Sequence, residues 1–222
     1  EVVPVSSSAQ LHLLPWLLRW PVVADRTTFA AGLHAGSAVG LALALRPSPG
    51  ELARVLPATM PAALVGFAAH EVVERRLGRP APTAALLAAV GLALAVADRR
   101  AGSRPVSQGD TAAAGAAQVA ALVPGVSRSG ATLLALRWRG VRREDALRTS
   151  LVMSLPVTLG AAALTAARSR RTPALLPSLV AGAASFVTAR RVVGSSRMYT
   201  GSALYRLGLA TAVAVRLRKE TR

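Results

Sequence analysis

The chain has 222 residues, of which 52% are hydrophobic and 17% are charged, and its mean hydropathy is +0.43. This composition argues against a water-soluble domain, which normally carries more charge and fewer long apolar runs, and the lack of cysteine excludes disulfides and thiol chemistry. The net charge of +17 comes almost entirely from arginines clustered between apolar segments, as at membrane helix ends beside anionic lipids, so we expect no nucleic-acid partner.

The first element in chain order is an apolar segment interrupted by a proline and three serines. It reads Val2-Val3-Pro4-Val5-Ser6-Ser7-Ser8-Ala9-Gln10-Leu11. The apolar pieces on either side of the serines are too short to cross a bilayer alone. Glu1 comes directly before it, without an initiator methionine or a signal-peptide pattern. We therefore expect the natural chain to begin upstream.

Six further apolar stretches approach or reach the 17–25 residues of a membrane-spanning helix. They cover residues 29–45, 55–70, 83–97, 149–167, 173–189 and 201–217, and Arg206 interrupts the last of them. Nearly every connecting loop carries arginine, so the distribution of cations gives no membrane orientation. We expect an all-α fold, a polytopic membrane helix bundle.

A second broken segment lies between the third and fourth of these stretches. It reads Ala120-Ala121-Leu122-Val123-Pro124-Gly125-Val126-Ser127-Arg128-Ser129-Gly130-Ala131-Thr132-Leu133-Leu134. Both broken segments share the pattern Val-Pro-(Gly)-Val-Ser-X-Ser, which predicts inverted repeats at about residues 1–100 and 105–222 of a single membrane domain. Paired broken or re-entrant helices point to a binding site near the middle of the fold. For the first segment alone, an ordinary interhelical turn is an equal alternative.

The second broken segment has the composition of a phosphate-binding site. The helix that begins after Pro124-Gly125 offers unpaired N–H groups at its N-terminus, where anions bind readily. Arg128 adds a planar cation suited to bidentate phosphate contact. Hydroxyls that can cap the helix or donate to phosphate, and glycines that allow close backbone approach, complete the site: Ser127, Ser129, Thr132, Gly125 and Gly130.

The other polar residues carry weaker signals. Glu1 has the chemistry of a base, a metal ligand or an orienting group, although an exposed chain end is its simpler interpretation. The three histidines, His12, His34 and His70, are isolated, and we interpret each as packed or interfacial. The scattered aspartates exclude an Asp-rich diphosphate–magnesium box, and no P-loop, GxGxxG or zinc pattern is present.

The two broken segments resemble the motifs of the bacitracin-resistance type undecaprenyl-diphosphate phosphatases. That family's first motif, roughly Glu-(Phe/Val)-Leu-Pro-Val-Ser-Ser-(Ser/Thr)-Gly-His-Leu, is similar to residues 1–11. Its second motif, Pro-Gly-X-Ser-Arg-Ser-X-X-Thr, is present without a change at residues 124–132. Further residues also sit where the family tends to place them, so the likeness covers most of the chain: Asp110, Gln118, Leu33-His34-Ala35-Gly36 and Tyr205-Arg206.

The resemblance implies hydrolysis of a polyprenyl diphosphate to the monophosphate and phosphate in the bacterial inner membrane, by a multi-pass protein that recycles the cell-wall lipid carrier. The implied partners are the lipid substrate and membrane lipids, and a homodimer is compatible with it. It implicates Glu1, Ser7, Ser127 and Arg128 in catalysis, and Ser6, Gln10, Gly125, Ser129, Gly130 and Thr132 in substrate binding. A divalent cation, Mg²⁺ or Ca²⁺, is the one cofactor left open, with Glu1 as its candidate ligand.

This chain departs from the family pattern where the family's histidine falls on Gln10, because glutamine cannot act as a base. If that histidine activates the nucleophile, we expect a loss of roughly 10²–10⁴-fold. A transporter or flippase of the phosphorylated lipid carrier is the alternative function, because inverted repeats with broken helices are also transporter architecture. Turnover distinguishes the two. Acid-phosphatase type lipid phosphatases need a later catalytic histidine, and no histidine follows His70.

Overall fold

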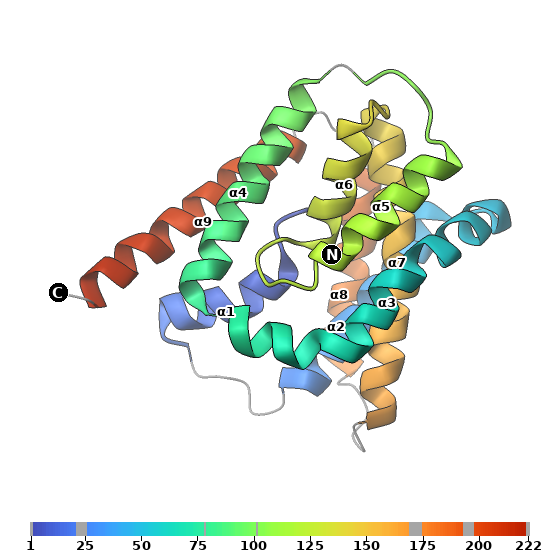
Figure 1. Ribbon diagram of the computed structural model, residues 1–222. Coiled ribbons are helices and arrows are strands. Elements are labelled where there is room, and N and C mark those ends of the chain that lie inside the picture. The colour runs from blue at the N-terminus through green and yellow to red at the C-terminus, as the bar shows by residue number, and fades with distance from the viewer. Residues whose placement is uncertain are drawn as a thin grey trace.

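The computed structural model describes residues 2–20, 26–77, 79–100, 102–168, 175–192 and 198–220. Within these ranges the chain forms helices and loops and no strand, so the expected all-α fold is confirmed (Figure 1). In chain order the helices are α1 (Ser7–Leu18), α2 (Arg26–Leu45), α3 (Pro49–Leu77), α4 (Pro80–Arg99), α5 (Gln108–Ala120), α6 (Arg128–Trp138), α7 (Arg143–Arg168), α8 (Leu175–Val192) and α9 (Met198–Glu220).

The six apolar stretches of the sequence correspond to the six longest helices: α2, α3, α4, α7, α8 and α9. Several of these helices extend beyond the apolar stretch, because polar residues cap them. At the start of α3, for example, the Ser48 N–H donates to Glu51 Oε2 (2.8 Å) and the Glu51 N–H donates to Ser48 Oγ (3.2 Å). By length and composition, α4 and the part of α7 over Arg143–Leu164 are apolar enough to cross a membrane.

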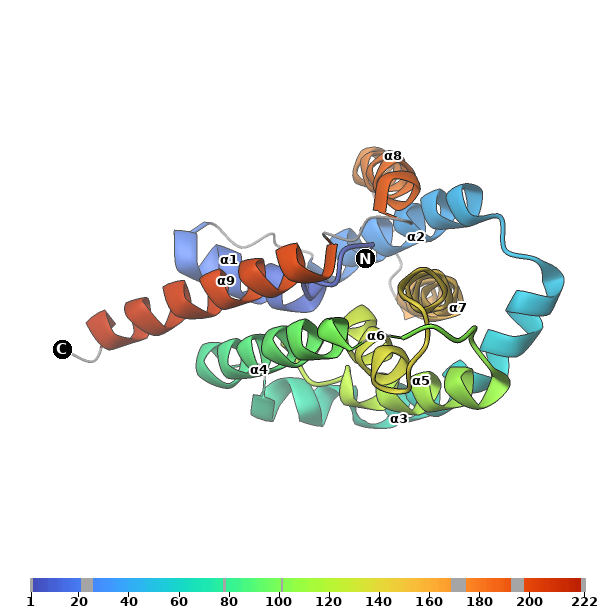
Figure 2. The same cartoon turned by 90° about the horizontal axis from the view of Figure 1, so that it is seen from above.

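The most closely packed long helices form two groups, one of two helices and one of three. α4 and α9 run side by side along one flank, whereas α2 packs on both α7 and α8 (Figures 1 and 2). The α2–α8 crossing depends on glycine, because a Cβ at Gly36 or Gly40 would collide with the backbone carbonyl of Ser178 or Gly182. Small residues at such crossings allow membrane helices to approach closely.

The short helices α5 and α6 pack against each other, α5 also against α3 and α6 against α4 and α7, and they form the second broken segment as a helix–loop–helix. Asp110 anchors their outer ends, because its carboxylate is bound by Arg104 Nη1 (2.6 Å) and by Arg139 Nε (2.6 Å). Ser107 adds a capping box at the start of α5. The Arg104 guanidinium holds the pKa of Asp110 well below its usual range. This network fixes the positions from which α5 and α6 converge on the loop at residues 121–127.

Candidate active site

The second serine loop, residues 121–127, ends at a residue with unusual backbone geometry. Ser127 has φ of 71° and directly precedes α6, and its Oγ accepts the Gly130 N–H (3.2 Å). The Ser129 hydroxyl lies 3.2 Å from the Ser127 hydroxyl. Gly125 has φ of 102°, and a Cβ there would collide with the Thr83 carbonyl oxygen of α4. The loop can therefore lie against α4 only with glycine at this position.

The first serine loop, residues 2–6, enters α1 in a similar way. Ser6 has φ of 68° and directly precedes the helix, as Ser127 does before α6. Unlike Ser127, the Ser6 side chain makes no capping hydrogen bond, and its Oγ lies 3.4 Å from Ser8 Oγ. The two serines that align in the sequence pattern thus share a positive φ, which non-glycine residues seldom adopt, although their ψ angles differ (84° for Ser6 and 129° for Ser127).

A buried arginine of α9 joins the two loops. Arg206 is 0% exposed, and its Nε donates to the Pro4 carbonyl of the first loop (2.6 Å). Its Nη1 donates long hydrogen bonds of 3.5 Å to the Gly125 and Val126 carbonyls of the second loop. The Ser202 hydroxyl, one turn earlier on α9, also donates to the Pro4 carbonyl (2.8 Å). Loops that are far apart in the sequence are therefore held on the same helix.

Both loops open onto one interior cavity with a volume of about 210 Å³. The start of α1 contributes Ser7 and Ser8 to its wall, and the start of α6 contributes Arg128 and Ser129 beside Ser127. Residues of the two loops and of α2, α3, α5 and α7 complete the wall, and most of these are apolar: Val3, His34, Ala62, Gln118, Ala121, Leu122, Val157, Thr158 and Ala161. The hydroxyls and the guanidinium expected from the two motifs thus face a shared space inside the bundle.

Two side chains of the cavity wall, Arg128 and Gln118, have polar groups suited to binding a ligand. Arg128 Nη1 donates to the Ser154 carbonyl of α7 (3.3 Å), which orients the guanidinium at the cavity wall. Gln118 of α5 is 2% exposed, and neither its amide nitrogen nor its amide oxygen has a hydrogen-bond partner among the described residues. Leaving a buried polar group unpaired costs about 1–3 kcal/mol, so native proteins rarely do so without a reason. A phosphate oxygen in the cavity would accept from this amide.

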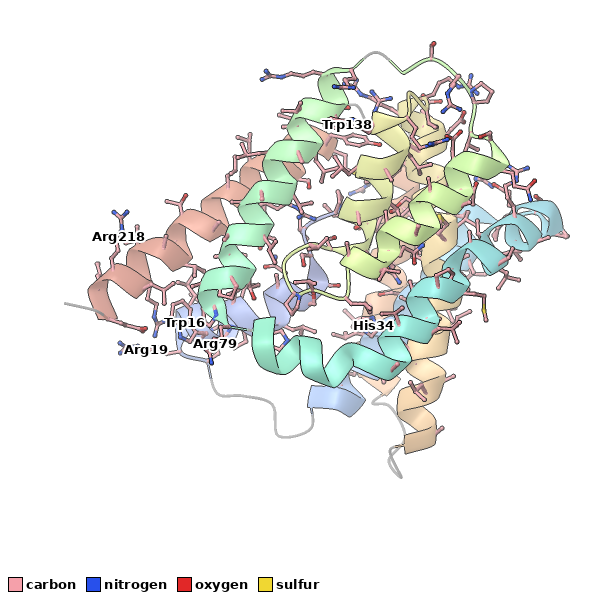
Figure 3. All side chains as sticks on the ribbon, viewed as in Figure 1. Trp16, Arg19, His34, Arg79, Trp138 and Arg218 are labelled. Carbon is pink, nitrogen blue, oxygen red and sulfur yellow. The ribbon has the colours of Figure 1, made fainter. Side chains whose placement is uncertain are left out.

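His34 of α2 also lines the cavity (Figure 3). The sequence offered little to assign it there, because it is isolated among apolar residues and distant in the chain from both serine motifs. Gln118 also stands among apolar residues, six residues before the Pro124 that begins the second motif. Their only signal in the sequence is the likeness of their surroundings to the family pattern. Helix packing, which the sequence does not give, brings them to the site.

Other expected substrate-binding residues do not line the cavity. Gln10 donates through Nε2 to the Val5 carbonyl (3.0 Å), and its Oε1 accepts from the Tyr205 hydroxyl (2.7 Å). The Thr132 hydroxyl lies 2.6 Å from Ser150 Oγ of α7. These side chains support the loops instead of facing the cavity.

Four further candidates also lie away from the cavity or outside the described residues. Ser6 and Gly125 form the bends of the two loops, and neither lines the cavity. Gly130 makes room for the guanidinium of Arg206, because a Cβ there would lie 2.8 Å from Nη2. Glu1 lies outside the described residues. Within the described part of the chain, no group of three or more His, Cys, Asp or Glu residues could hold a metal ion.

Comparison with known proteins adds independent information on this arrangement. The family model described as "Bacitracin resistance protein BacA" matches residues 1–212. The undecaprenyl-diphosphatases of Geobacter metallireducens and Geobacter sulfurreducens are each 38% identical over 189 residues, covering 74% of this chain and 70% of their own length. The undecaprenyl-diphosphatase of Acidiphilium cryptum is 32% identical over 230 residues, which cover 85% of this chain and 81% of that protein.

Proposed function

Because this chain belongs to the bacitracin resistance protein BacA family, we propose that it hydrolyses undecaprenyl diphosphate to the monophosphate and inorganic phosphate. The named activity of its relatives and the match over residues 1–212 support this assignment. It is a membrane protein, and we further propose that it crosses the bacterial cell membrane several times, with the lipid carrier of cell-wall synthesis as its substrate.

The observation that carries the proposal is the meeting of both serine motifs at one cavity. A diphosphate needs cationic and hydrogen-bonding partners, and this wall offers Arg128, the Gln118 amide and several serine hydroxyls. The N-terminus of α6 adds the positive end of a helix dipole. The apolar remainder of the wall suits the first isoprene units of a lipid. The cavity therefore matches a substrate with a charged head and a hydrocarbon tail.

The reaction needs mainly positioning and charge stabilisation. Attack at the terminal phosphorus expels a lipid monophosphate, a leaving group that needs little protonation. In our proposal Arg128 stabilises the charge on the transferred phosphoryl group, and Ser127 and Ser129 donate hydrogen bonds to its oxygens. We assign Ser7, and Glu1 outside the described residues, to positioning the water molecule that attacks the phosphorus.

We also propose that the chain consists of inverted repeats at about residues 1–100 and 105–222. The paired serines with positive φ, Ser6 and Ser127, support this division. The order of elements supports it as well, because α1 and α6 each follow a serine loop and are each followed by three longer helices. In this arrangement the cavity lies between the two repeats, where the broken segments meet.

The test is release of phosphate from undecaprenyl diphosphate by the purified full chain in detergent. We expect turnover by the wild-type protein and almost none by Arg128→Ala. Arg218→Ala is the matched control, because Arg218 is an exposed arginine at the outer end of α9 (Figure 3). Substrate binding without phosphate release by the wild type would refute the phosphatase and favour a transporter or flippase of the same lipid.

A further inference from the structure

We infer that His34 of α2 accepts the proton released when the terminal phosphate of the lipid diphosphate is attacked. This inference rests on the proposed phosphatase function and adds a catalytic residue to it. His34 lies outside both serine motifs, yet it lines the same cavity as Ser7, Ser127 and Arg128. Two observations support this role: His34 is the one base among the described residues of the cavity wall, and both ends of the Gln10 amide are hydrogen-bonded away from the cavity.

The chemistry of the cavity wall leaves few proton acceptors. Among the described residues that line it, only His34 and Arg128 carry ionisable side chains, and the remainder are apolar residues, serines, a threonine and a glutamine. A guanidinium stays protonated in proteins, and an amide or a hydroxyl is too weak a base to accept a proton near neutral pH. Imidazole changes its charge between about pH 5 and 8, which makes it the common acceptor in hydrolases.

Gln10 does not compete for this role. Its amide oxygen accepts from the Tyr205 hydroxyl, and its nitrogen donates to the Val5 carbonyl, so both ends are engaged away from the cavity. α1 therefore supplies hydroxyls to the cavity through Ser7 and Ser8, but the residue one turn further along supplies no base. The proton acceptor must therefore come from another element of the cavity wall. Among the described residues, α2 provides it with His34.

Few charges face His34 from the elements around it. Ala121 and Leu122 of the second loop are uncharged, and so are the cavity residues of α3, α5 and α7: Ala62, Gln118, Val157, Thr158 and Ala161. From α8, Ser178 and Gly182 pack beside α2 and carry no charge. Arg128 of α6 is the one charged neighbour at the described cavity wall. Glu1 is the remaining candidate, outside the described residues, and must be tested alongside His34.

The proposed step consumes one water molecule, which attacks the lipid diphosphate. Its oxygen forms a bond to the terminal phosphorus while the bond between that phosphorus and the bridging oxygen breaks. The lipid monophosphate leaves with the electron pair of the broken bond, and a proton of the water moves to an imidazole nitrogen of His34. The imidazolium then returns this proton to bulk water. The products are inorganic phosphate and the lipid monophosphate, and no other reactant is consumed.

The first test compares His34→Gln with His12→Gln in the purified full chain, with undecaprenyl diphosphate as substrate at pH 5–9. A positioned base contributes about 10²–10⁴-fold, so we expect kcat of His34→Gln to fall by that factor with little change in KM. We also expect the plot of kcat against pH to show an inflection for the wild type that is absent from His34→Gln. His12→Gln, the same substitution on α1 away from the cavity, should keep both the rate and the inflection.

A second variant separates chemistry from folding. His34→Ala leaves space at the cavity wall, and added imidazole should restore part of its kcat, whereas imidazole should not stimulate Arg128→Ala. Melting temperatures of all variants are measured in the same detergent. If His34→Gln unfolds, the imidazole response of His34→Ala, with substrate binding measured in parallel, decides the question.

Several outcomes would overturn the role of His34. They are a kcat of His34→Gln close to that of the wild type, an inflection that persists in His34→Gln but vanishes in Glu1→Gln, or a substrate-binding His34→Ala that imidazole fails to stimulate. These results would leave the phosphatase assignment intact, because the wild type would still release phosphate and Arg128→Ala would not. If the wild type released no phosphate, the proposed function itself would fail.

Discussion

The two serine loops have similar backbones, but different parts of the molecule hold them in place. Side chains of the second loop and of the first turns of α6 stabilise it locally: Ser127 caps α6, Thr132 contacts Ser150, and Arg128 donates to the Ser154 carbonyl. The first loop lacks a side-chain cap and has one local side-chain bond, from Gln10 to the Val5 carbonyl, while Ser202 and Arg206 of α9 hydrogen-bond its Pro4 carbonyl. A shared sequence pattern therefore does not imply a shared source of stability.

This difference also separates the chemical roles of the loops. Arg128 and Ser7 occupy aligned positions in the two patterns, directly after the serine with positive φ, and both line the cavity. Only the second loop brings a cation. The first loop brings a hydroxyl, and its conformation depends on a helix near the other end of the chain. The following predictions test this division.

The largest effect should come from Arg128. Its replacement by alanine removes the cation that neutralises the transferred phosphoryl group, and arginines in that role contribute about 10³–10⁵-fold to kcat. Arg128→Lys should recover only part of the loss, because an ammonium cannot make the bidentate contact. At the aligned position, Ser7→Ala should cost less, since it removes a neutral hydroxyl. Steady-state phosphate release measures all three variants, and equal losses for Arg128→Ala and Ser7→Ala would contradict the division.

The next effect concerns the connection through α9. Arg206→Met should lower stability by about 1–3 kcal/mol, because it removes the short hydrogen bond to the Pro4 carbonyl, which keeps the one from Ser202, and the two long ones to the second loop. Hydrogen exchange should increase more in residues 2–10 than in residues 121–127, since the second loop keeps its own contacts. Arg218→Met is the control, an exposed arginine of the same helix. Equal increases in both loops would show that Arg206 supports them to the same degree.

A smaller effect is expected at the two serines with positive φ. Ser127→Ala removes the cap of α6 and should reduce stability by about 0.5–2 kcal/mol. Ser6→Ala should cost less, because the Ser6 hydroxyl makes no cap and contacts only Ser8 Oγ at 3.4 Å. Thermal unfolding in one detergent provides the comparison. The reverse order of costs would mean that the first loop carries an internal support which its hydrogen bonds do not reveal.

The smallest effect should come from the partly exposed contact between Tyr205 and Gln10. Tyr205→Phe removes one hydrogen bond and should cost about 0.5–1.5 kcal/mol or less. Gln10→His should leave kcat nearly unchanged, because residue 10 does not line the cavity. A large gain in turnover from Gln10→His would instead mean that an imidazole at this position reaches the substrate.

The sequence predicted the helices well, because length and apolar composition largely determine which segments form long membrane helices. It also indicated that the two serine motifs belong together, since their patterns are alike. It did not reveal the function of Arg206, which stood out only as an interruption of the last apolar stretch. The buried position of that arginine depends on how α9 is rotated against α4, and Gly91 of α4 lies against its side chain. Such contacts arise from packing between distant segments.

His34 and Gln118 illustrate the same limit at the site. Each is a polar residue flanked by apolar neighbours in its helix, and many such residues only complete a core. Their assignment to the cavity required the positions of six helices relative to one another. The glutamine in place of the family's histidine could be read directly from the sequence. The hydrogen bond that Gln10 accepts from Tyr205, far along the chain, could not.

The hydrogen bonds from α9 to Pro4 have a consequence for the order in which the protein is made. A ribosome synthesises the first serine loop early and α9 late, so the loop enters the membrane well before its hydrogen-bond donors exist. The second loop and most of its local contacts are complete before α9 emerges. In a nascent chain the second loop should therefore already have its contacts with α7, whereas the first loop lacks its donors on α9 until that helix has been synthesised.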